Sequence, residues 1–306
     1  MKSNFPHIGL ARLCGWFGIS RQAYYQHGWD TLSTAVEDEM IITQVKQIRS
    51  RHRRMGTRKL YELLQPFLLE EKIKIGRDAL FDLLAANHLL VRKRRRRIQT
   101  TNSYHRFRKH PNLIRDMVPT VINQIWVCDI TYWKLKNDHV YISLITDAYS
   151  HKIVGYHLGE TMEAEESIQA LKMALASLEP ENEIRPIHHS DRGIQYCSNS
   201  YIKLLKENKI GISMTESGDP LENAIAERVN GIVKEEYLDN YEIDAVSQAK
   251  ELLKATVNLY NKERPHMTLG NFTPEEIHRS EKELKPKRLW KNYYKKETTF
   301  VNPLQD

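Results

Sequence analysis

Between residues 119 and 278, hydrophobic positions alternate in some segments at the period of a strand and recur in others at the period of a helix. Runs rich in β-branched and aromatic residues predict strands near 125–134, 139–147, 152–159, 186–189 and 210–214. Amphipathic runs predict helices near 163–178, 199–208 and 245–262, and Asn137-Asp138 predicts a hairpin turn. The order of these elements indicates an α/β domain with a mixed five-stranded sheet.

The segment from Pro220 to Leu238 is predicted to form one further helix. Its apolar positions recur at helical steps and form one stripe, made of Leu221, Ile225, Val229 and Ile232. A different face carries one carboxylate, two amides and one ammonium, which are Asn223, Glu227, Asn230 and Lys234. Taken alone, such a polar face is the ordinary solvated side of a helix.

Two acids in the predicted strands change this interpretation. Asp129 lies in the middle of the first strand, where a carboxylate is costly unless it has a partner or a task. Asp191 follows the strand near 186–189, and Gly193 allows a tight turn immediately after it. Thirty-five residues separate Asp191 from Glu227. These two acids and Glu227 are therefore candidates for a functional role.

The first hundred residues are predicted to be helical. Residues 8–27 read as helix, turn and helix, with Gly18 in the turn and Ser20 as the N-cap of the second helix. This second helix offers Arg21, Gln22 and Tyr25 to a partner, although a plain helical hairpin remains the alternative. Further helices are expected over 36–49, from 56 or 57 to about 65, and over 77–86, separated by a basic bend from 49 to 59.

Charge is distributed unevenly, although the net charge is only +7. Residues 1–118 hold 23 Lys and Arg against 10 Asp and Glu, residues 119–278 hold 15 against 25, and residues 279–306 hold 8 against 4. Six cations are consecutive: Arg92, Lys93, Arg94, Arg95, Arg96 and Arg97. This distribution indicates a polyanion bound by the basic ends and cations gathered by the acidic middle. The aromatic residues of the basic tail suit nucleic-acid stacking, and docking on the domain is an equal alternative.

Three scattered cysteines, without a C-x-x-C pair, argue against a disulfide framework and a zinc finger. The chain shows no signal-peptide pattern and no apolar run of membrane-spanning length. We therefore expect a cytoplasmic, nucleoid-associated protein.

Several short motifs resemble the catalytic protein of bacterial insertion sequences of the third large family, the product of their second reading frame. They are WVCDITY at 126–132, HSDRGIQY at 189–196, NAIAE at 223–227, YNKERPH at 260–266 and TPEE at 273–276. Asp129, Asp191 and Glu227 resemble the D,D-35-E triad of transposases and retroviral-type integrases, and Lys234 lies where that family carries a Lys or Arg. Glu222 departs from the family, in which Asp is commoner at this position.

The resemblance implies a ribonuclease-H-like catalytic core, preceded by all-α helix-turn-helix modules, in a DNA transposase that performs strand cleavage and 3′-OH strand transfer. It implies a two-metal site for Mg²⁺ or Mn²⁺ held by Asp129, Asp191 and Glu227. Expected DNA contacts are Lys234, Asn223, His189 and Arg192 near the triad, with Arg21, Gln22, Tyr25 and residues 92–97 elsewhere. His189 is equally interpreted as a structural histidine, and Lys234 as a surface lysine.

The expected domains are a helix-turn-helix over 1–34, a second, winged helix-turn-helix over 35–98, a linker over 99–118, the catalytic core over 119–278 and a tail over 279–306. Expected partners are the element's terminal inverted repeats and target DNA, a second copy of the chain, and an upstream-frame protein as fusion or partner. Two other classes remain open. A non-catalytic DNA-binding regulator needs no competent triad, and a ribonuclease-H-type nuclease needs no sequence-reading helix-turn-helix.

Overall fold

The computed structural model describes residues 6–92, 106–115, 117–178, 185–216 and 220–279. The chain divides into two compact units, Met1–Arg92 and Lys93–Asp306. Among the helices of the described ranges, none combines the length and the apolar composition needed to span a bilayer. The cationic residues Lys93 to Arg97, the first part of the expected linker and the tail after Arg279 lie outside the described residues.

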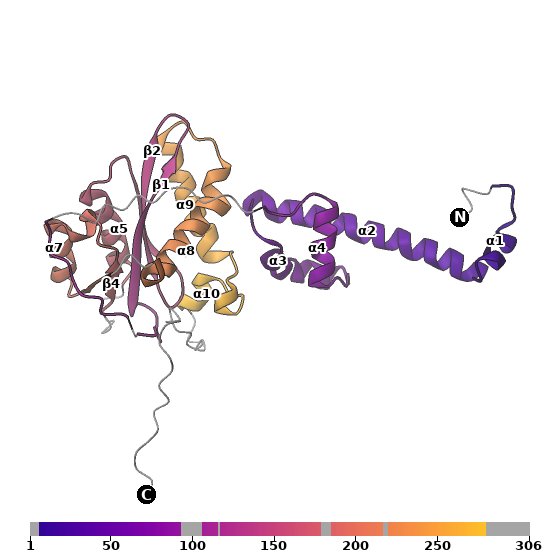
Figure 1. The fold of residues 1–306 in the computed structure, drawn as a ribbon, viewed down its shortest axis with the longest axis horizontal. Coiled ribbons are helices and arrows are strands. Elements are labelled where there is room, and N and C mark those ends of the chain that lie inside the picture. The colour runs from indigo at the N-terminus through magenta and orange to yellow at the C-terminus, as the bar shows by residue number, and fades with distance from the viewer. Residues whose placement is uncertain (1–5, 93–105, 116, 179–184, 217–219, 280–306) are drawn as a thin grey trace, which may run out of the picture. The chain divides into compact units, whose positions relative to one another are not determined.

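The first unit is helical throughout its described residues. It contains α1 (Leu10–Trp16), α2 (Arg21–Arg51), α3 (Thr57–Glu70) and α4 (Arg77–Ala86) (Figure 1). Ser20 caps α2 as predicted, because its hydroxyl accepts a hydrogen bond from the amide of Ala23 at 2.9 Å. The second half of α2 packs with α3 and α4 around a buried core of Ile41, Val45, Leu60, Leu64, Leu80 and Leu84. No strand forms in residues 6–92, so the expected wing is absent from this stretch.

Two helix predictions in this unit were wrong. The helices expected near 20–27 and over 36–49 are one continuous helix, α2, which runs through the expected module boundary at residue 34. No proline interrupts residues 21–51, and Ser33 and Thr34 are tolerated inside a helix. Helix α3 also continues past Pro66 to Glu70. Burial of Leu68 in the core extends the apolar stripe and offsets the hydrogen bond that the proline removes.

The second unit is built on the predicted five-stranded mixed sheet. Its strands are β1 (Ile125–Lys134), β2 (His139–Asp147), β3 (Ile153–Gly159), β4 (Ile187–Ser190) and β5 (Gly211–Met214), in the spatial order β3-β2-β1-β4-β5. β1, β2 and β3 are antiparallel, and β4 and β5 run parallel to β1. This arrangement is the ribonuclease-H-like fold, as expected.

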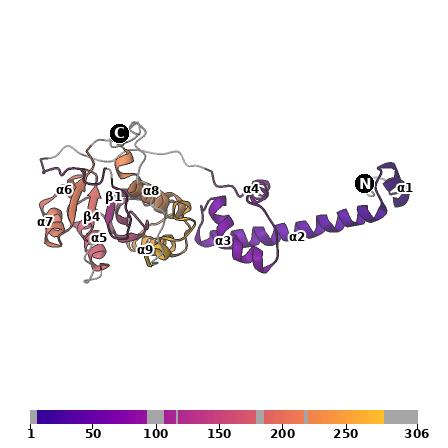
Figure 2. The same cartoon turned by 90° about the horizontal axis from the view of Figure 1, so that it is seen from below.

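Helices cover both faces of this sheet (Figures 1 and 2). On one face lie α5 (Ala164–Ala176), α6 (Ile194–Cys197) and α7 (Asn199–Glu207), packed on a cluster that includes Trp126 and Cys128 of β1. On the other lie α8 (Ala224–Ile232) and α9 (Val246–Lys262), packed on Val127 and Trp133. α10 (Pro274–Arg279) packs beside α9. Odd and even residues of β1 thus face different helices, as the pleat requires.

The second half of the expected linker is part of the α/β unit. Ile114 is fully buried against Ile125, Val127 and Ala226. The amide of Leu113 donates to the hydroxyl of Ser213 at 2.9 Å, and the amide of Met214 donates to the carbonyl of Pro111 at 3.2 Å. A chain segment with a buried apolar side chain and bonds to the last strand is a packed element, so the unit begins before residue 119.

The stretch from Pro220 to Asn240 is helical but is not one α-helix, which corrects the prediction. A 3-10 turn (Pro220–Asn223) precedes α8, and a π-helical turn (Val233–Tyr237) and a second 3-10 turn (Leu238–Asn240) follow it. Val229 and Ile232 are buried as predicted. The π turn inserts an extra residue into the helical repeat, so side chains after residue 232 are rotated relative to those before it.

Candidate active site

Asp129 and Asp191 lie beside each other because of the register between β1 and β4. The parallel pairing runs from Ile125 opposite Ile187 to Cys128 opposite Ser190. Asp129 is the next residue of β1 after Cys128, and Asp191 is the first residue after the end of β4. Neighbouring strands are about 4.8 Å apart, and paired residues of a parallel ladder point to the same face. The sheet therefore brings together two acids that are 62 positions apart in the sequence.

Helix α8 lies over this edge and carries Glu227. The side-chain amide of Asn230 donates to one carboxylate oxygen of Asp129 at 2.8 Å. The side-chain amide of Asn223 donates to the carbonyl of Cys128 at 2.9 Å. Glu227 is four residues after Asn223 and three before Asn230, so all three share one face of the helix. The two asparagines are buried and bind the helix to β1, whereas Glu227 is exposed at the surface of the same site.

The carboxyl group of Asp129 is electrostatically coupled to the other two acids. Burial raises its pKa, the charge of Asp191 raises it further, and Glu227 adds a smaller effect in the same direction. Hydrogen bonds from Asn230 and from the amide of Ile130, at 2.9 Å, act in the opposite direction. The resulting pKa of Asp129 is about 7. Asp191 is oriented by the amide of Gly193, which donates to its carboxylate at 2.9 Å.

The atoms near Asp129 that could bind a metal ion are carboxylate and amide oxygens. Within the described residues, no three His, Cys, Asp or Glu side chains approach closely enough to enclose a metal ion. Two buried acceptors, the amide oxygens of Asn223 just before α8 and of Asn230 on it, have no hydrogen-bond partner among the described residues. Their orientation is determined by chemistry, because each amide nitrogen must face the carbonyl or carboxylate that it binds. Buried acceptors without a donor are rare in folded proteins, and a hydrated cation would supply donors here.

Lys234 extends from the π-helical turn to β1. Its ammonium lies over the ring of Tyr132, 3.8 Å from the ring centroid. Burial lowers the pKa of Lys234 from its usual value, and the residue is half-buried. Tyr132 lies three residues after Asp129, on the part of β1 that extends beyond β4. The ammonium therefore lies against β1, three residues beyond Asp129 along the strand.

A buried ion pair holds the π-helical turn in place. Arg264, which is 1% exposed, donates two hydrogen bonds to Glu236, at 2.9 and 2.8 Å, and a contact of 3.0 Å joins it to the ring of His266. The YNKERPH motif therefore acts through the interior, by fixing the segment that carries Lys234. The side chain of Asn261 in this motif accepts a hydrogen bond from the amide of Ile153 and donates one to its carbonyl, both at 3.0 Å. These two bonds join α9 to β3.

His189 is fully buried, and both ring nitrogens have partners in the protein. One nitrogen lies 2.9 Å from the hydroxyl of Ser213, and the other lies 3.0 Å from the carbonyl of Glu222. Burial lowers the pKa of His189 to about 4, so the ring is neutral near pH 7. This placement favours the structural interpretation of His189 over the phosphate contact. Arg192 is half-buried next to Asp191, and Gln195 is buried with its amide on the carbonyl of Met162 at 2.8 Å.

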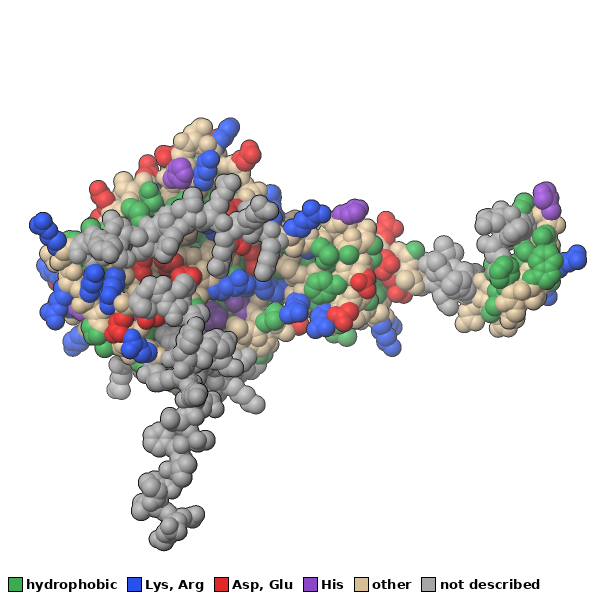
Figure 3. Space-filling view, in the orientation of Figure 1, with side chains coloured by type: hydrophobic (Ala, Val, Ile, Leu, Met, Phe, Trp, Pro, Cys, Tyr) green, Lys and Arg blue, Asp and Glu red, His purple; other side chains and the backbone are tan. Residues whose placement is uncertain are grey.

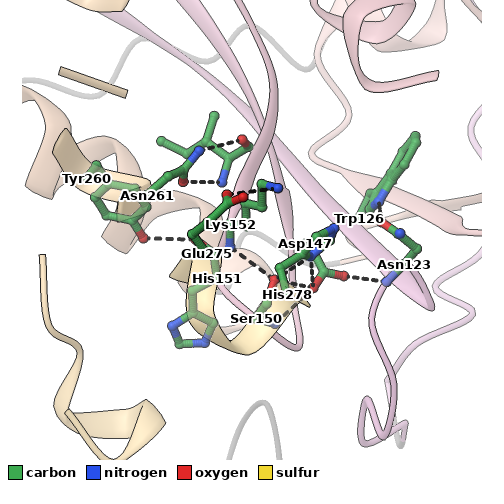
Figure 4. A network of polar contacts seen from close by, with 11 residues as sticks. Asn123, Trp126, Asp147, Ser150, His151, Lys152, Tyr260, Asn261, Glu275 and His278 are labelled. Carbon is green, nitrogen blue, oxygen red and sulfur yellow. Dashed lines mark hydrogen bonds and ion pairs between the residues drawn. The ribbon is translucent and has the colours of Figure 1, made fainter. Parts of the chain in front are cut away.

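A second polar network, around Asp147, was not singled out from the sequence (Figure 4). Asp147 ends β2, is fully buried, and accepts hydrogen bonds from the amides of Asn123 and Ser150 and from the Ser150 hydroxyl, at 2.9, 2.8 and 2.6 Å. The Ser150 hydroxyl lies 2.9 Å from His278 of α10, and Lys152 pairs with Glu275 at 2.9 Å. The TPEE motif therefore anchors the last helix to the β2–β3 turn. A buried acid at the end of a predicted strand was the available signal.

The other expected DNA contacts belong to the first unit. Arg21, Gln22 and Tyr25 are exposed on the first turns of α2. Arg92 is exposed at the end of the described part of that unit, and the five cations after it lie outside the described residues.

Comparisons with known proteins agree with this arrangement. A family profile described as "Integrase core domain" matches residues 120–220, and a second with the same description matches residues 208–274. The uncharacterized 31 kDa protein of insertion element IS600 from Shigella sonnei is 36% identical over 267 residues, which cover 86% of this chain and 96% of that protein. The transposase for insertion sequence element IS629 from Shigella sonnei is 28% identical over 89% of this chain and 92% of its own length.

Among solved structures, the catalytic core domain of HTLV-2 integrase in complex with magnesium is 21% identical, with a TM-score of 0.42, over 52% of this chain and 97% of that one. The two integrase-core profiles together span all three acids, and the IS600 relative aligns over nearly the whole of both chains. On this sequence similarity and the sheet topology, the chain belongs to the insertion-sequence transposases of the third family, which carry an integrase core domain.

Proposed function

We propose that this transposase cuts DNA strands at the ends of its own element and joins the freed 3′-hydroxyl to another strand, with divalent cations held by Asp129, Asp191 and Glu227. The observation that carries this proposal is the position of Asp129. It lies beside Asp191 by strand register, is bonded to the helix of Glu227, and has a pKa of about 7 because burial and both neighbouring charges oppose its ionisation. Three acids so placed need a cation to ionise together.

The residues present fit Mg²⁺ or Mn²⁺. Carboxylate oxygens are the ligands that these hard ions prefer, and the buried amide oxygens of Asn223 and Asn230 suit the hydrogens of bound water. When bound, a pair of such ions activates the attacking oxygen and stabilises the leaving oxygen of a phosphodiester. Asp129 and Asp191 would hold the ions from the sheet, and Glu227 from the helix. Glu227 is the exposed member of the three, so its position depends on α8.

The remaining residues of the site orient these acids and the DNA. Asn230 fixes one oxygen of Asp129, and the amide of Gly193 fixes one oxygen of Asp191. Preorganisation of this kind lowers the cost of arranging charge at the moment of reaction. Lys234 holds a positive charge over Tyr132, three residues after Asp129 on β1, and we assign it to the neutralisation of a DNA phosphate. Arg192 is half-buried next to Asp191, so we retain it as a DNA contact, whereas the buried Asn223, which is bonded to the carbonyl of Cys128, is assigned to positioning α8.

The substrate we propose is double-stranded DNA at two kinds of site, the terminal inverted repeats and the target. The exposed Arg21, Gln22 and Tyr25 would contact base edges or backbone, and the cationic run from Arg92 would contact phosphates. Because two element ends must be processed together, we propose that two or more copies of the chain act on paired ends, with an upstream-frame protein as fusion or partner.

The test is a strand-cleavage and joining assay on the element's terminal DNA with Mg²⁺, comparing wild type with Glu227→Gln. Gln keeps the size of Glu227 and removes its charge, and Glu235→Gln, an exposed change on the same helical stretch, is the matched control. Joined products from wild type and the control, but not from Glu227→Gln, support the proposal. Equal activity in all three would show that the triad is misassigned. Tight DNA binding without cleavage by wild type would favour the regulator, and preferential cutting of RNA–DNA hybrids would favour the nuclease.

A further inference from the structure

The corner between α2 and α3 concentrates positive charge that the catalytic site does not use. From Met40 to Tyr61 the chain has no acidic residue, and six of the eleven residues from Arg49 to Lys59 are Lys or Arg. Arg51, Arg53 and Arg58 are exposed. Figure 3 shows cationic side chains (blue) on the helical unit near the end of α2. A compact group of cations on a small folded unit is the electrostatic footprint of a polyanion partner.

Two arginines of this corner are bonded to neutral backbone carbonyls. Arg49 donates to the carbonyl of Leu89 and, at 3.3 Å, to that of Met55, and Arg54 donates to the carbonyl of Arg92. Such bonds hold the guanidinium groups in place without neutralising their charge. Side chains that are ordered before binding lose less entropy when a ligand arrives. The corner is therefore both charged and organised.

The bond from Arg54 also connects the corner to the chain that leaves α4. Arg92, whose carbonyl it binds, is exposed and is the first of six consecutive cations. Arg54 and Arg92, which are 38 positions apart in the sequence, thus meet at one place in the fold. Their proximity extends the positive surface beyond the bend itself.

The neighbouring helix α4 does not offer comparable charge. From Arg77 to Ala86 it contains one cation and two acids, and that cation pairs with Asp78 at 2.8 Å. The same acid also lies within electrostatic range of Arg58, so it offsets part of the charge at the start of α3. In a helix-turn-helix the second helix usually enters the groove. Here that helix has a net negative charge, so the backbone contact of this unit is expected on the α2–α3 corner instead.

We propose that the α2–α3 corner, centred on Arg51, Arg53 and Arg54 and extended by Arg92, is a phosphate-contacting surface for double-stranded DNA. This inference rests on the proposed function as a DNA transposase. It assigns the corner a sequence-independent role: the corner positions the duplex backbone and reads no bases. Guanidinium groups suit this role, because they bind phosphate oxygens in a bidentate fashion and keep their charge at any physiological pH.

The experiment measures the salt dependence of DNA binding by the full-length chain. Probes are a duplex with the element's end sequence and an unrelated duplex of equal length. Each phosphate contact contributes about 0.9 to the slope of log affinity against log salt concentration. Arg51→Ala/Arg53→Ala is therefore expected to reduce the slope by about 1.8 on both duplexes. Arg51→Lys/Arg53→Lys keeps the charge and should keep the slope.

The matched control is Lys72→Ala/Lys74→Ala, which removes the same charge from exposed positions after the far end of α3. An unchanged slope in the arginine variant, or an equal loss in the control, would overturn the proposal. Strand cleavage and transfer are measured separately. If wild type cleaves DNA but the slope of Arg51→Ala/Arg53→Ala equals that of wild type, only the proposed role of the corner is refuted. If the slope of this variant falls but wild type does not cleave DNA, only the proposed transposase chemistry is refuted.

Discussion

Replacing Asp129 by Asn is expected to make the metal-free protein more stable relative to wild type as pH rises. Folding raises the pKa of this carboxyl from its ordinary value of 3.8 to about 7. The folded state therefore binds the proton more tightly than the unfolded state does. In wild type, stability from this group is full below about pH 4 and is lost as pH rises to about 7. Asn does not titrate, so the difference between the two proteins follows this curve.

The size of the effect follows from the pKa difference. One unit corresponds to about 1.4 kcal/mol, so the full shift would be worth about 4 kcal/mol between pH 3 and pH 8. Asp129 is half-buried, and solvent screening reduces this figure, so we expect about 2 kcal/mol. Asn has a single side-chain oxygen and loses one of two accepted hydrogen bonds, those from Ile130 and Asn230, which costs about 1 kcal/mol at every pH. This constant loss does not affect the change with pH.

Denaturant unfolding at several pH values, with a chelator present, measures this quantity. Trp126 and Trp133 flank Asp129 on β1 and are 0% and 1% exposed, so their fluorescence reports the unfolding of this unit. Asp138→Asn, at an exposed position in the adjoining hairpin turn, is the matched control. Addition of Mg²⁺ at pH 8 should stabilise wild type and leave Asp129→Asn unchanged. A pH-independent difference for Asp129→Asn would refute the raised pKa of Asp129, on which the proposed need for a cation depends.

Two further predictions concern the π-helical turn. Tyr132→Leu removes the ring beneath the Lys234 ammonium and is expected to reduce the salt-dependence slope of DNA binding by about 0.9, as Lys234→Ala would. Tyr132→Phe keeps the ring and should bind DNA as wild type does. Equal slopes for the Leu and Phe variants would show that the ring does not position the lysine. Glu236→Gln leaves the buried Arg264 charge without its partner and should destabilise the protein by about 3 kcal/mol in thermal or denaturant unfolding. The exposed Glu235→Gln should cost less than about 0.5 kcal/mol. Similar losses of stability for the two variants would contradict the anchoring role of Glu236.

The strands and most helices of the α/β unit could be predicted from the sequence because their patterns are local. A strand buried on one or both faces shows its period within five to ten residues, and a helix shows its stripe within three turns. The predicted range 125–134 for the first strand and the observed β1 therefore coincide. Asp129 could also be found, since a carboxylate inside a predicted strand is conspicuous without knowledge of its neighbours.

Partnerships between distant residues were decided only by the tertiary structure. No local pattern predicts that Ile114 is buried under β1, that Arg264 pairs with Glu236, or that Asp147 accepts a hydrogen bond from the amide of Asn123. The continuity of α2 through residue 34 also depends on packing, because residues of moderate helix propensity adopt whichever conformation the core favours.

The site illustrates the same division. The sequence, through its resemblance to a known family, predicted which three acids and which lysine form the site. The fold decided that His189 is an interior residue, that Asn223 and Asn230 bind α8 to β1, and that Lys234 lies on Tyr132. The physical reason is that hydrophobic periodicity is set by burial within one element, whereas a buried polar group must find its partner wherever the folded chain provides one.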